Sequence, residues 1–256
     1  MALSSDQEQL KNDLTATGET WSQTWQNILT LDPSYFKAYL NLRRVPVNKQ
    51  CLPRKTQELI LLAMDASCTH LYEPGVRAHT AAALQAGATK EEIMEALELT
   101  SVLGVHAVTA GVPCLQEVMR EMGKDSKASS EALDGERQAL KDDFVHRRGY
   151  WSTSWPPVLQ LSPGFFKAYT DYSGVPFEEG HRALDAKTKE LIYCAIDCAT
   201  THLYLPGLKI HIRNAINYGA TEEEVMEVFE LAALMGAQTV KMGADVLVQE
   251  MERGAK

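Results

Sequence analysis

The 256-residue chain lacks the features that mark two large classes of protein. It has no excess of basic residues, because 25 lysines and arginines stand against 34 acidic residues, for a formal net charge of −9. This balance provides no basic stripe for phosphate backbones, so nucleic acid is not an expected partner. No stretch of 18 residues runs without polar interruption, and so no membrane span is expected.

Cysteine is also scarce and does not form a recognisable framework. The chain has five cysteines, an odd number without the density of a disulfide-stabilised scaffold, which favours reduced thiols. The first residues, MALSSDQEQLKNDL, carry acidic side chains where a signal peptide has an apolar run. The expected location is therefore the cytoplasm.

The most informative feature present is an internal repeat. The segment THLYEPGVRAH at 69–79 recurs as THLYLPGLKIH at 201–211. Residues 58–104 align with 190–236 without a gap, and 23 of the 47 positions are identical. Each copy of the segment carries one histidine before and one after a proline-glycine pair. The duplication therefore includes residues suited to acid-base or ligand chemistry.

The repeat predicts two domains of ordinary size. Tryptophan, proline and aromatic positions continue to match upstream, with the register shifted by two residues. The predicted domains are residues 5–120 and 135–251, joined by a linker at 121–134 that contains Lys, Ser and Asp. Two copies are too few for a solenoid, so two halves of one globule or a covalent pseudo-dimer is expected.

Apolar residues recur at helical spacing, and the ends of the expected helices carry the matching signals. Thr89 and Thr221 each precede acidic residues, the pattern of a helix N-cap. Pro33 and Pro163 stand at expected first helical positions. We expect about six helices in each half and no strand, so the predicted class is all-α.

One predicted helix in each half carries carboxylates on an apolar background. Residues 58–64 read ELILLAM, which predicts a helix that is buried all round. Glu58 and Asp65 share a face of it, as do Glu190 and Asp197 in the second half. A buried carboxylate must be paired or have a raised pKa, and the downstream histidines are the candidate partners.

Between these carboxylates and the histidines, proline and glycine predict a turn. Pro74 and Pro206 are expected to end the buried helix, and Gly75 and Gly207 to permit the turn. The outer histidine of each motif then falls in the first turns of the next helix.

On these residues the chain resembles the carboxymuconolactone decarboxylase and alkylhydroperoxidase D (AhpD-like) family. The resemblance rests on Lys-Thr-Gln-Glu58-Leu-Ile and on His79-x-x-x-Ala-x-x-x-Gly87-Ala-Thr-x-Glu-Glu-Ile, each with its counterpart around Glu190 and His211. It implies two tandem helical domains that form a pseudo-dimer, and a homo-oligomer in which three chains resemble a hexamer.

The resemblance also separates two branches of chemistry. The hydroperoxidase branch has a Cys-x-x-Cys pair ahead of the family histidine, and those positions hold Tyr72 and Gly75 here, with Tyr204 and Gly207 in the second half. The decarboxylase branch uses neither a metal nor an organic cofactor, and none is expected here.

The resemblance and the burial pattern together indicate the candidate catalytic residues. His79 and His211 are expected to carry acid-base chemistry, with Glu58 and Glu190 setting the tautomer or relaying the proton. The alternative is that each Glu-His pair is a buried structural link between two helices.

Other residues are candidates for substrate binding, each with a structural alternative. His70 and His202 either cap the first helix or lie in the pocket. Arg77 and Lys209 each offer a cation for a substrate carboxylate or lie at the surface, and Tyr72 and Tyr204 are expected to line the pocket. His106, which aligns with Gln238, favours the first half as the active one.

The cysteines and tryptophans have simpler interpretations. Cys194, Cys198 and His202 are spaced for one helix, where small core residues are a better interpretation than a metal or redox site. The lack of a clear third ligand also argues against a metal site at His70 and His79. The tryptophans, spaced four residues apart in both halves, are expected to be core or interface anchors.

The sequence therefore favours a cofactor-independent lyase or isomerase, of the decarboxylase type, acting on a small lactone or keto acid. A thiol-based peroxidase that uses other cysteines is the second hypothesis. A noncatalytic helical binding or assembly module is the third.

Overall fold

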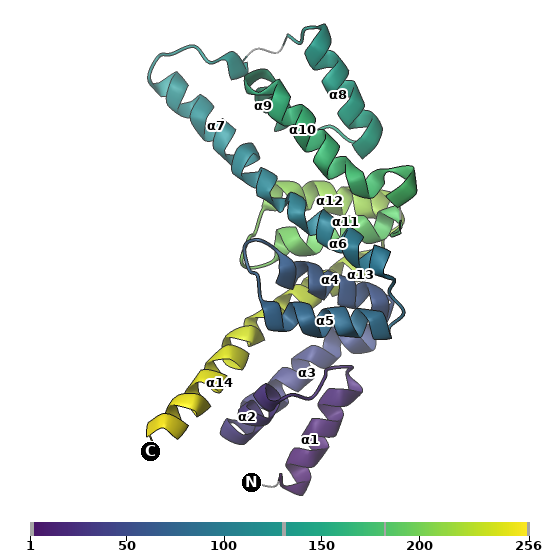
Figure 1. Cartoon of the computed structure of the whole chain (residues 1–256), viewed down its shortest axis with the longest axis vertical. Coiled ribbons are helices and arrows are strands. Elements are labelled where there is room, and N and C mark those ends of the chain that lie inside the picture. Colours follow the sequence, from purple (N-terminus) through teal and green to yellow (C-terminus); the bar gives the residue numbers. More distant parts are fainter. Residues whose placement is uncertain (1–2, 130–131, 182, 255–256) are drawn as a thin grey trace. The chain divides into compact units, whose positions relative to one another are not determined.

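The computed structural model describes residues 3–129, 132–181 and 183–254, and these contain helices and no strand. They divide into two compact units, residues 1–88 with 186–256, and residues 89–185. The predicted all-α class is confirmed, with seven α-helices from each repeat among the described residues in place of about six (Figure 1).

The first unit contains most of the first repeat and the C-terminal part of the second. Its helices are α1 (Ser5–Ala16), α2 (Gln23–Leu31), α3 (Pro33–Lys49), α4 (Arg54–Ala66), α5 (Glu73–Gln85), α11 (Ala186–Cys198), α12 (Leu205–Asn217), α13 (Glu222–Ala233), the short 3₁₀ helix η5 (Leu234–Gly236) and α14 (Ala237–Gly254).

The second unit contains the end of the first repeat and the beginning of the second. Its helices are α6 (Lys90–Ser101), η1 (Val102–Val105), α7 (His106–Glu121), η2 (Lys127–Ser129), α8 (Gly135–Arg148), α9 (Trp155–Leu161), α10 (Pro163–Gly174), η3 (Val175–Phe177) and η4 (Glu179–His181). Its core gathers Phe144, Trp155, Val158, Leu159 and Phe166. The predicted linker at 121–134 includes η2, and its residues 130–131 lie outside the described residues.

The compact units therefore do not coincide with the sequence repeats. Within the first unit, the hairpin α4–α5 of one repeat lies beside the hairpin α11–α12 of the other, because α4 packs against α11. This is the contact expected of a pseudo-dimer. The predicted domain bounds describe the duplicated sequence, and they stay a prediction.

The two repeats are also joined by polar contacts within each unit. Glu227 of α13 accepts hydrogen bonds from the backbone N–H of Cys51, at 2.9 Å, and from the Gln57 amide, at 2.8 Å. In the second unit, Glu95 of α6 accepts from the backbone N–H groups of Ala183 and Leu184, both at 2.7 Å. Each repeat thus supplies a buried carboxylate that orders a loop of the other.

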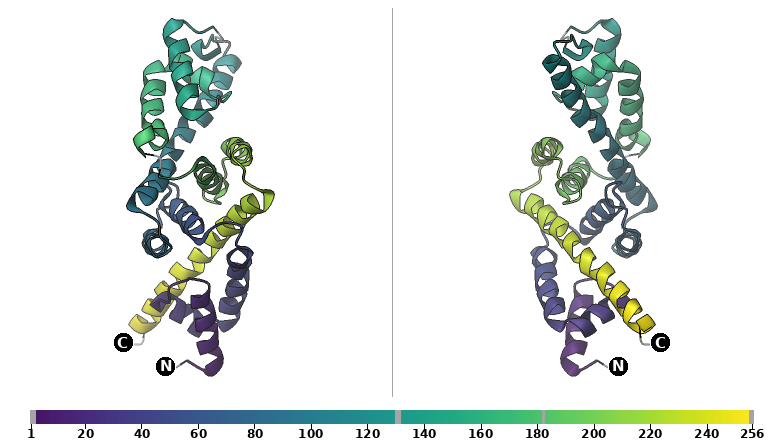
Figure 2. Two further views of the ribbon diagram at one scale, coloured as in Figure 1. Left: turned by 90° about the vertical axis from the view of Figure 1, so that its right-hand side faces the viewer. Right: turned by 90° about the vertical axis from the view of Figure 1, so that its left-hand side faces the viewer.

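Helix ends follow the predicted signals. Thr89 and Thr221 each form a capping box with the glutamate three residues later, and α3 and α10 begin at Pro33 and Pro163. Long α14 then packs along α2 in the first unit, which the two side views also show (Figure 2). This packing carries side chains of the second repeat to the site of the first.

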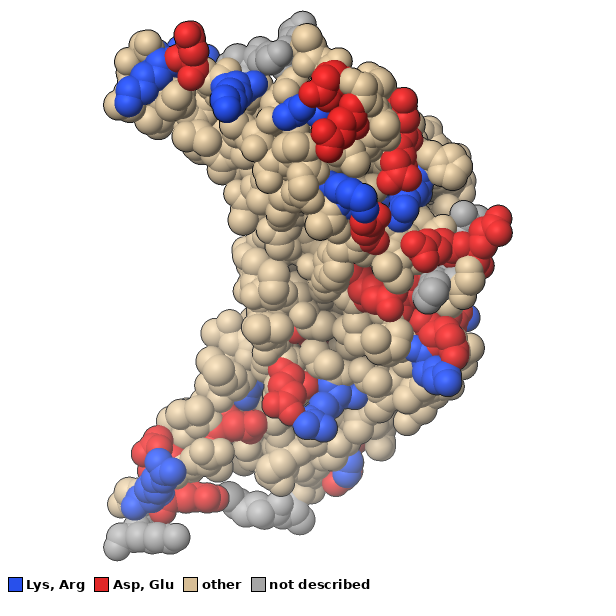
Figure 3. Space-filling view, turned by 45° about the horizontal axis from the view of Figure 1, so that its top comes forward, with Lys and Arg blue, Asp and Glu red and all other residues tan. Residues whose placement is uncertain are grey.

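Two continuous helical stretches, Lys90–Glu121 and Glu222–Gly254, are long and apolar enough to cross a membrane by length and composition alone. The sequence prediction of no such span did not anticipate them. The finding is weak support for a membrane protein, because core helices of water-soluble proteins pass the same test. On the face drawn in Figure 3, basic side chains are interspersed with acidic ones.

Candidate functional site

The first repeat brings His79 and Glu58 together across the hairpin of α4 and α5. Helix α4 is buried from Thr56 to Asp65, as its apolar sequence predicted. Nδ1 of His79 lies 2.7 Å from Oε2 of Glu58. Because a carboxylate can only accept, the Nδ1 proton is donated to Glu58, and Nε2 remains for other chemistry. Arg54, four residues before Glu58, forms an ion pair with the same carboxylate.

Asp65 lies on the same face of α4 as Glu58, closer to the end of the helix. It approaches the other nitrogen of the His79 imidazole. Its Oδ2 lies 3.7 Å from Nε2 of His79, and its side chain is 2% exposed. Among the described residues, this oxygen has no hydrogen-bond partner. Burial raises the pKa of the Asp65 carboxyl, against the lowering effects of a hydrogen bond from Gln238 and of both nearby histidines. The imidazole is thus held between two buried carboxyl groups.

The turn between the helices differs from the sequence prediction. Helix α4 ends at Ala66, and Pro74 lies in the first turn of α5, where a missing N–H costs nothing. The left-handed residue of the turn is Leu71, with φ of 50°, and its counterpart is Leu203, with φ of 49°. The turn prediction for Pro74 and Gly75 was therefore wrong in its details.

Gly75 has a different role, which is to make room for Asp65. A Cβ at this position would lie 1.7 Å from Oδ2 of Asp65, and at Gly207 it would lie 2.3 Å from Oδ2 of Asp197. The glycine of each motif therefore lets a carboxylate of the buried helix reach the start of the histidine helix.

His70 does not cap α4, because it lies four residues beyond the end of that helix. Its Nε2 is 2.5 Å from Oε1 of Gln238, whose Nε2 donates to Oδ1 of Asp65 at 2.7 Å. Since the amide nitrogen is used on Asp65, the amide oxygen accepts from the imidazole, which places the His70 proton on Nε2. His70 therefore joins the site through a residue of the second repeat.

Part of this cluster borders a cavity of about 370 Å³ in the first unit. His79, Asp65 and Tyr72 line it, together with Gln238 and Lys241 from α14. Nζ of Lys241 lies 3.1 Å from Oε1 of Glu19, another lining residue. Arg77 also borders the cavity, but its side chain is 77% exposed and is paired with Glu73.

The second repeat builds a related but different pair. Nδ1 of His211 lies 2.6 Å from Oε2 of Glu190, whose other oxygen accepts from Asn214 at 3.3 Å. The His211 ring stacks on Tyr193 with a centroid distance of 4.5 Å, and Asp197 lies 4.0 Å from its Nε2. The first repeat has Ala82 and Leu61 where this one has Asn214 and Tyr193, so the imidazoles have different neighbours.

The acidity of Asp197 is more strongly perturbed than that of Asp65. Burial, and to a lesser extent the charge of Glu190, raises the pKa of Asp197 to about 7, against the lowering effect of His211. Burial also disfavours the charged form of His202, which for an imidazole lowers the pKa. His202 and Tyr204 lie with their ring centroids 5.9 Å apart, and Lys209 is exposed.

His106 is not among the residues that line the cavity of His79. It begins α7 in the second unit, and the aligned Gln238 occupies the cavity instead, because α14 packs on the first unit. The expectation that His106 favours the first half as the active one stays a prediction, and the residue found at the cavity of His79 is the aligned Gln238.

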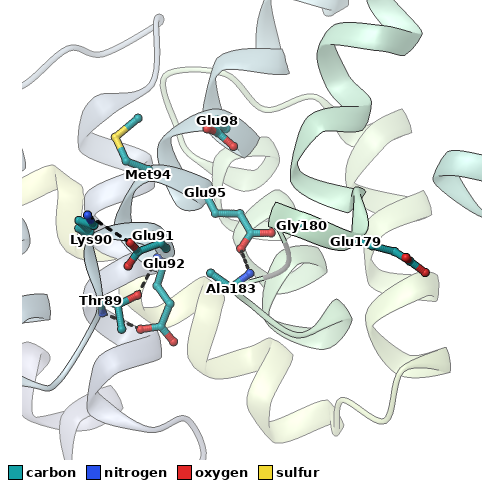
Figure 4. A pocket seen from close by; sticks show the side chains of 10 residues that line it. All are labelled: Thr89, Lys90, Glu91, Glu92, Met94, Glu95, Glu98, Glu179, Gly180 and Ala183. Carbon is teal, nitrogen blue, oxygen red and sulfur yellow. Dashed lines mark hydrogen bonds and ion pairs between the residues drawn. The ribbon is translucent and has the colours of Figure 1, made fainter.

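A larger cavity, of about 580 Å³, lies in the second unit, and glutamates and backbone dominate its lining (Figure 4). Glu92 caps α6 there, and Glu95 accepts from the backbone as described above. No histidine is among the described residues that line it. The cavity of His79 is therefore the better candidate site.

Sequence reasoning missed part of this site. Asp65 was grouped with Glu58 but not assigned a role, and the spacing that places both on one face of a helix was the available signal. Lys241 and Glu19 had no local signal, because they reach the site from other parts of the chain, and Gln238 was noted as the residue that aligns with His106.

The cysteines and tryptophans match the simpler interpretations. Cys194 is buried in α11, and the Sγ of Cys198 donates to the carbonyl of Ala195 at 3.4 Å. All five cysteines are free thiols. Trp25 and Trp155 are buried, and each packs on an aromatic of the following helix, Phe36 and Phe166 respectively.

Comparison with known proteins gives a consistent assignment. The family model described as the carboxymuconolactone decarboxylase family matches twice, at residues 33–120 and 163–248. A crystal structure from Burkholderia xenovorans LB400, named as a candidate gamma-carboxymuconolactone decarboxylase subunit, is 42% identical, with a TM-score of 0.92, and the match covers 97% of this chain and 98% of that one. None of the curated proteins compared with the chain matches it. The chain belongs to the carboxymuconolactone decarboxylase family, as a tandem member that lacks the Cys-x-x-Cys pair.

Proposed function

We propose that the chain is a cofactor-independent lyase or isomerase that acts on a small lactone acid or keto acid by acid-base chemistry at His79. The observation that carries the proposal is the His79 imidazole, held between Glu58 and Asp65 at the wall of a cavity of about 370 Å³. Cavities of roughly 300–1,000 Å³ take small ligands. The name of the Burkholderia relative supports a substrate of this kind.

The arrangement suits a decarboxylation in which His79 supplies the proton. The bond to the departing carboxylate breaks, CO₂ leaves, and the electron pair is delocalised onto the conjugated carbonyl of the substrate. His79, as the imidazolium, then donates its Nε2 proton to carbon, and Glu58 keeps the remaining proton on Nδ1. An isomerisation needs the same atom, which removes a proton at one carbon and returns it at another.

Asp65 lies where it can exchange a proton with the same nitrogen. Its Oδ2 faces Nε2 at 3.7 Å, and its raised pKa favours the form that carries a proton. A substrate that enters the cavity separates or bridges these two groups, and Asp65 then replenishes the proton that His79 has given. Burial of Asp65 and partial burial of His79 strengthen their interaction with developing charge.

The thiol alternative has less support in the geometry. Tyr72 and Gly75 occupy the positions of the redox cysteines. Burial raises the pKa of the Cys194 and Cys198 thiols, the latter to about 12, which disfavours the reactive thiolate. Replacement of all five cysteines with unchanged peroxide turnover would eliminate this alternative.

The protein is further proposed to work in the cytoplasm as a homo-oligomer, with a trimer of tandem chains as the expected form. The Burkholderia relative is named as a subunit, which supports assembly without fixing the number of chains. Light scattering coupled to size-exclusion chromatography measures that number directly.

The test is turnover of lactone acids and keto acids, followed by CO₂ release and by ultraviolet absorbance. His79→Ala is expected to lower kcat by about 10²–10⁴-fold, the usual contribution of a general acid or base. His211→Ala is the matched control and is expected to have a much smaller effect. Full turnover by a folded His79→Ala variant would refute the proposal, and no turnover by the wild type would favour the noncatalytic alternative.

A further inference from the structure

Lys241 is the cation that the second repeat contributes to the cavity of the first. It lies on α14 and lines the same cavity as His79 and Asp65. Its side chain is only 18% exposed. Nζ lies 3.1 Å from Oε1 of Glu19 and 4.5 Å from the ring centroid of Trp25. Lysine side chains are rarely so shielded from water unless they are paired, so the position of Lys241 calls for an explanation.

Pairing with Glu19 does not by itself account for Lys241, because Glu19 already has other partners. Arg43 lies 3.0 Å from Oε2 of Glu19, and the indole N–H of Trp25 donates to Oε1 at 3.1 Å. Burial tends to raise the pKa of Glu19, but the charges of Arg43, Lys241 and His79 outweigh it and hold the pKa at about 2. One carboxylate therefore stands between two permanent cations.

Of these two cations, only Lys241 faces the cavity. Arg43 is buried, is not among the residues that line the cavity, and donates from Nε to the hydroxyl of Thr17 at 2.9 Å. Arg77 lines the cavity but is exposed and tied to Glu73. Among the described residues that line the cavity, Lys241 is thus the cation shielded from solvent, and it shares the Glu19 carboxylate with Arg43.

The second repeat has no equivalent of this group. In the alignment, Thr109 stands opposite Lys241, Gly149 opposite Glu19, and Ser173 opposite Arg43. The Glu-His pair is duplicated, but the cation and the two residues that hold it are not. This group of charges is therefore not part of the duplicated motif, which points to a function specific to the cavity of His79.

We propose that Lys241 binds a substrate carboxylate in the first repeat's cavity, which makes that cavity selective for anionic substrates. Trp25 and Tyr72 supply flat walls, which suit a small planar or ring-shaped acid. This inference rests on the proposed function. An ion pair stabilises a carboxylate relative to neutral CO₂, so Lys241 suits a carboxylate that the substrate keeps through the reaction.

The test is a comparison of a charged and an uncharged probe with the same ring. The probes are 5-oxotetrahydrofuran-2-carboxylate and its methyl ester, and binding is measured by calorimetry at neutral pH and low salt. A charge-assisted contact predicts that the wild type binds the acid about tenfold more tightly than the ester. Lys241→Met is expected to abolish that preference, and Lys241→Arg to retain most of it.

The matched control is Lys11→Met. Nζ of Lys11 also lies over a tryptophan, at 5.5 Å from the Trp21 ring, but Lys11 is not among the residues that line the cavity. It is expected to leave the acid preference unchanged. If Lys241→Met fails to fold by circular dichroism, Lys241→Gln, which keeps a donor for Glu19, takes its place.

The inference is overturned if the wild type binds acid and ester alike, or if a folded Lys241→Met variant keeps the preference. These outcomes are separable from failure of the proposed function. Loss of turnover in His79→Ala with an intact acid preference in Lys241→Met leaves the catalytic proposal standing and removes the role of Lys241. The reverse pattern leaves a selective anion site without acid-base catalysis at His79.

Discussion

At the scale of single residues, the chemistry of the site depends on which nitrogen of His79 carries a proton. Glu58 fixes the Nδ1 proton of His79, which leaves Nε2 for Asp65 and the substrate. Sequence spacing predicted the Glu58–His79 contact because both belong to one motif. It offered the downstream histidines as partners of Asp65 without saying which ring Asp65 approaches, because that contact depends on how closely α5 approaches α4 at Gly75.

Glu58→Gln tests the role of this carboxylate. An amide can present its NH₂ to Nδ1, which favours the wrong tautomer of His79 without changing the size of the side chain. We expect kcat to fall about 10²-fold or more with little change in KM, by analogy with other wrong-tautomer substitutions. Steady-state kinetics across pH measures this.

Glu190→Gln is the control, since it makes the same change at His211. A comparable loss in both variants would contradict the assignment of catalysis to the first repeat.

Asp197 makes the stability of the protein depend on pH. Its pKa rises from an ordinary 3.8 to about 7 on folding, so the folded state favours the protonated form. This contribution is present below pH 4 and is lost as pH rises through about 7. We expect Asp197→Asn to unfold at a less pH-dependent temperature than the wild type between pH 5 and 8.

The effect on the free energy of unfolding should be on the order of 1–3 kcal/mol, from about 1.4 kcal/mol per pKa unit with an allowance for relaxation. Thermal unfolding followed by circular dichroism at several pH values is the measurement. Parallel curves for wild type and variant would show that Asp197 does not titrate in this range.

At the scale of elements, the turn between α4 and α5 stores backbone strain. Leu71 adopts a φ of 50° although its side chain is 69% exposed, and Leu203 repeats the conformation. A leucine gains little there from burial and loses energy by the left-handed backbone. The sequence predicted that Gly75 supplies the flexible backbone of the turn. In the fold, this glycine instead lets the Asp65 carboxylate approach α5 closely.

Leu71→Asn should stabilise the protein, because asparagine tolerates the left-handed region. The expected gain in the free energy of unfolding is about 0.5–1 kcal/mol, measured by urea denaturation. Leu84→Asn is the matched control, since Leu84 is exposed but helical in α5, and it should lose a few tenths of a kcal/mol through helix propensity. If Leu71→Asn instead destabilises the protein, the Leu71 side chain makes a stabilising contact that outweighs the backbone strain.

At the scale of the whole molecule, the second repeat contributes side chains that complete the first. Glu227 of the second repeat orders residues 51–57 of the first, and α14 brings Gln238 and Lys241 to the site of His79. A half of the sequence is therefore not a complete half of the structure.

Residues 1–134 expressed alone test this contribution. The fragment lacks α13 and α14, so the N–H of Cys51 and the amide of Gln57 lose their acceptor. We expect no cooperative thermal unfolding from a monomer of this fragment, as judged by calorimetry and light scattering. A monomeric fragment with a sharp transition would show that the repeat folds independently.

The sequence by itself determined the all-helical class, the capped ends of α6 and α13, the burial of α4 and the pairing of Glu58 with His79. These follow from local periodicity, from cap chemistry and from a motif within one hairpin. Tertiary structure decided the rest of the site. Gln238 meets Asp65 across 173 positions, and Lys241 meets Glu19 across 222. No local pattern encodes such contacts, because they exist only once α14 has packed on the other repeat.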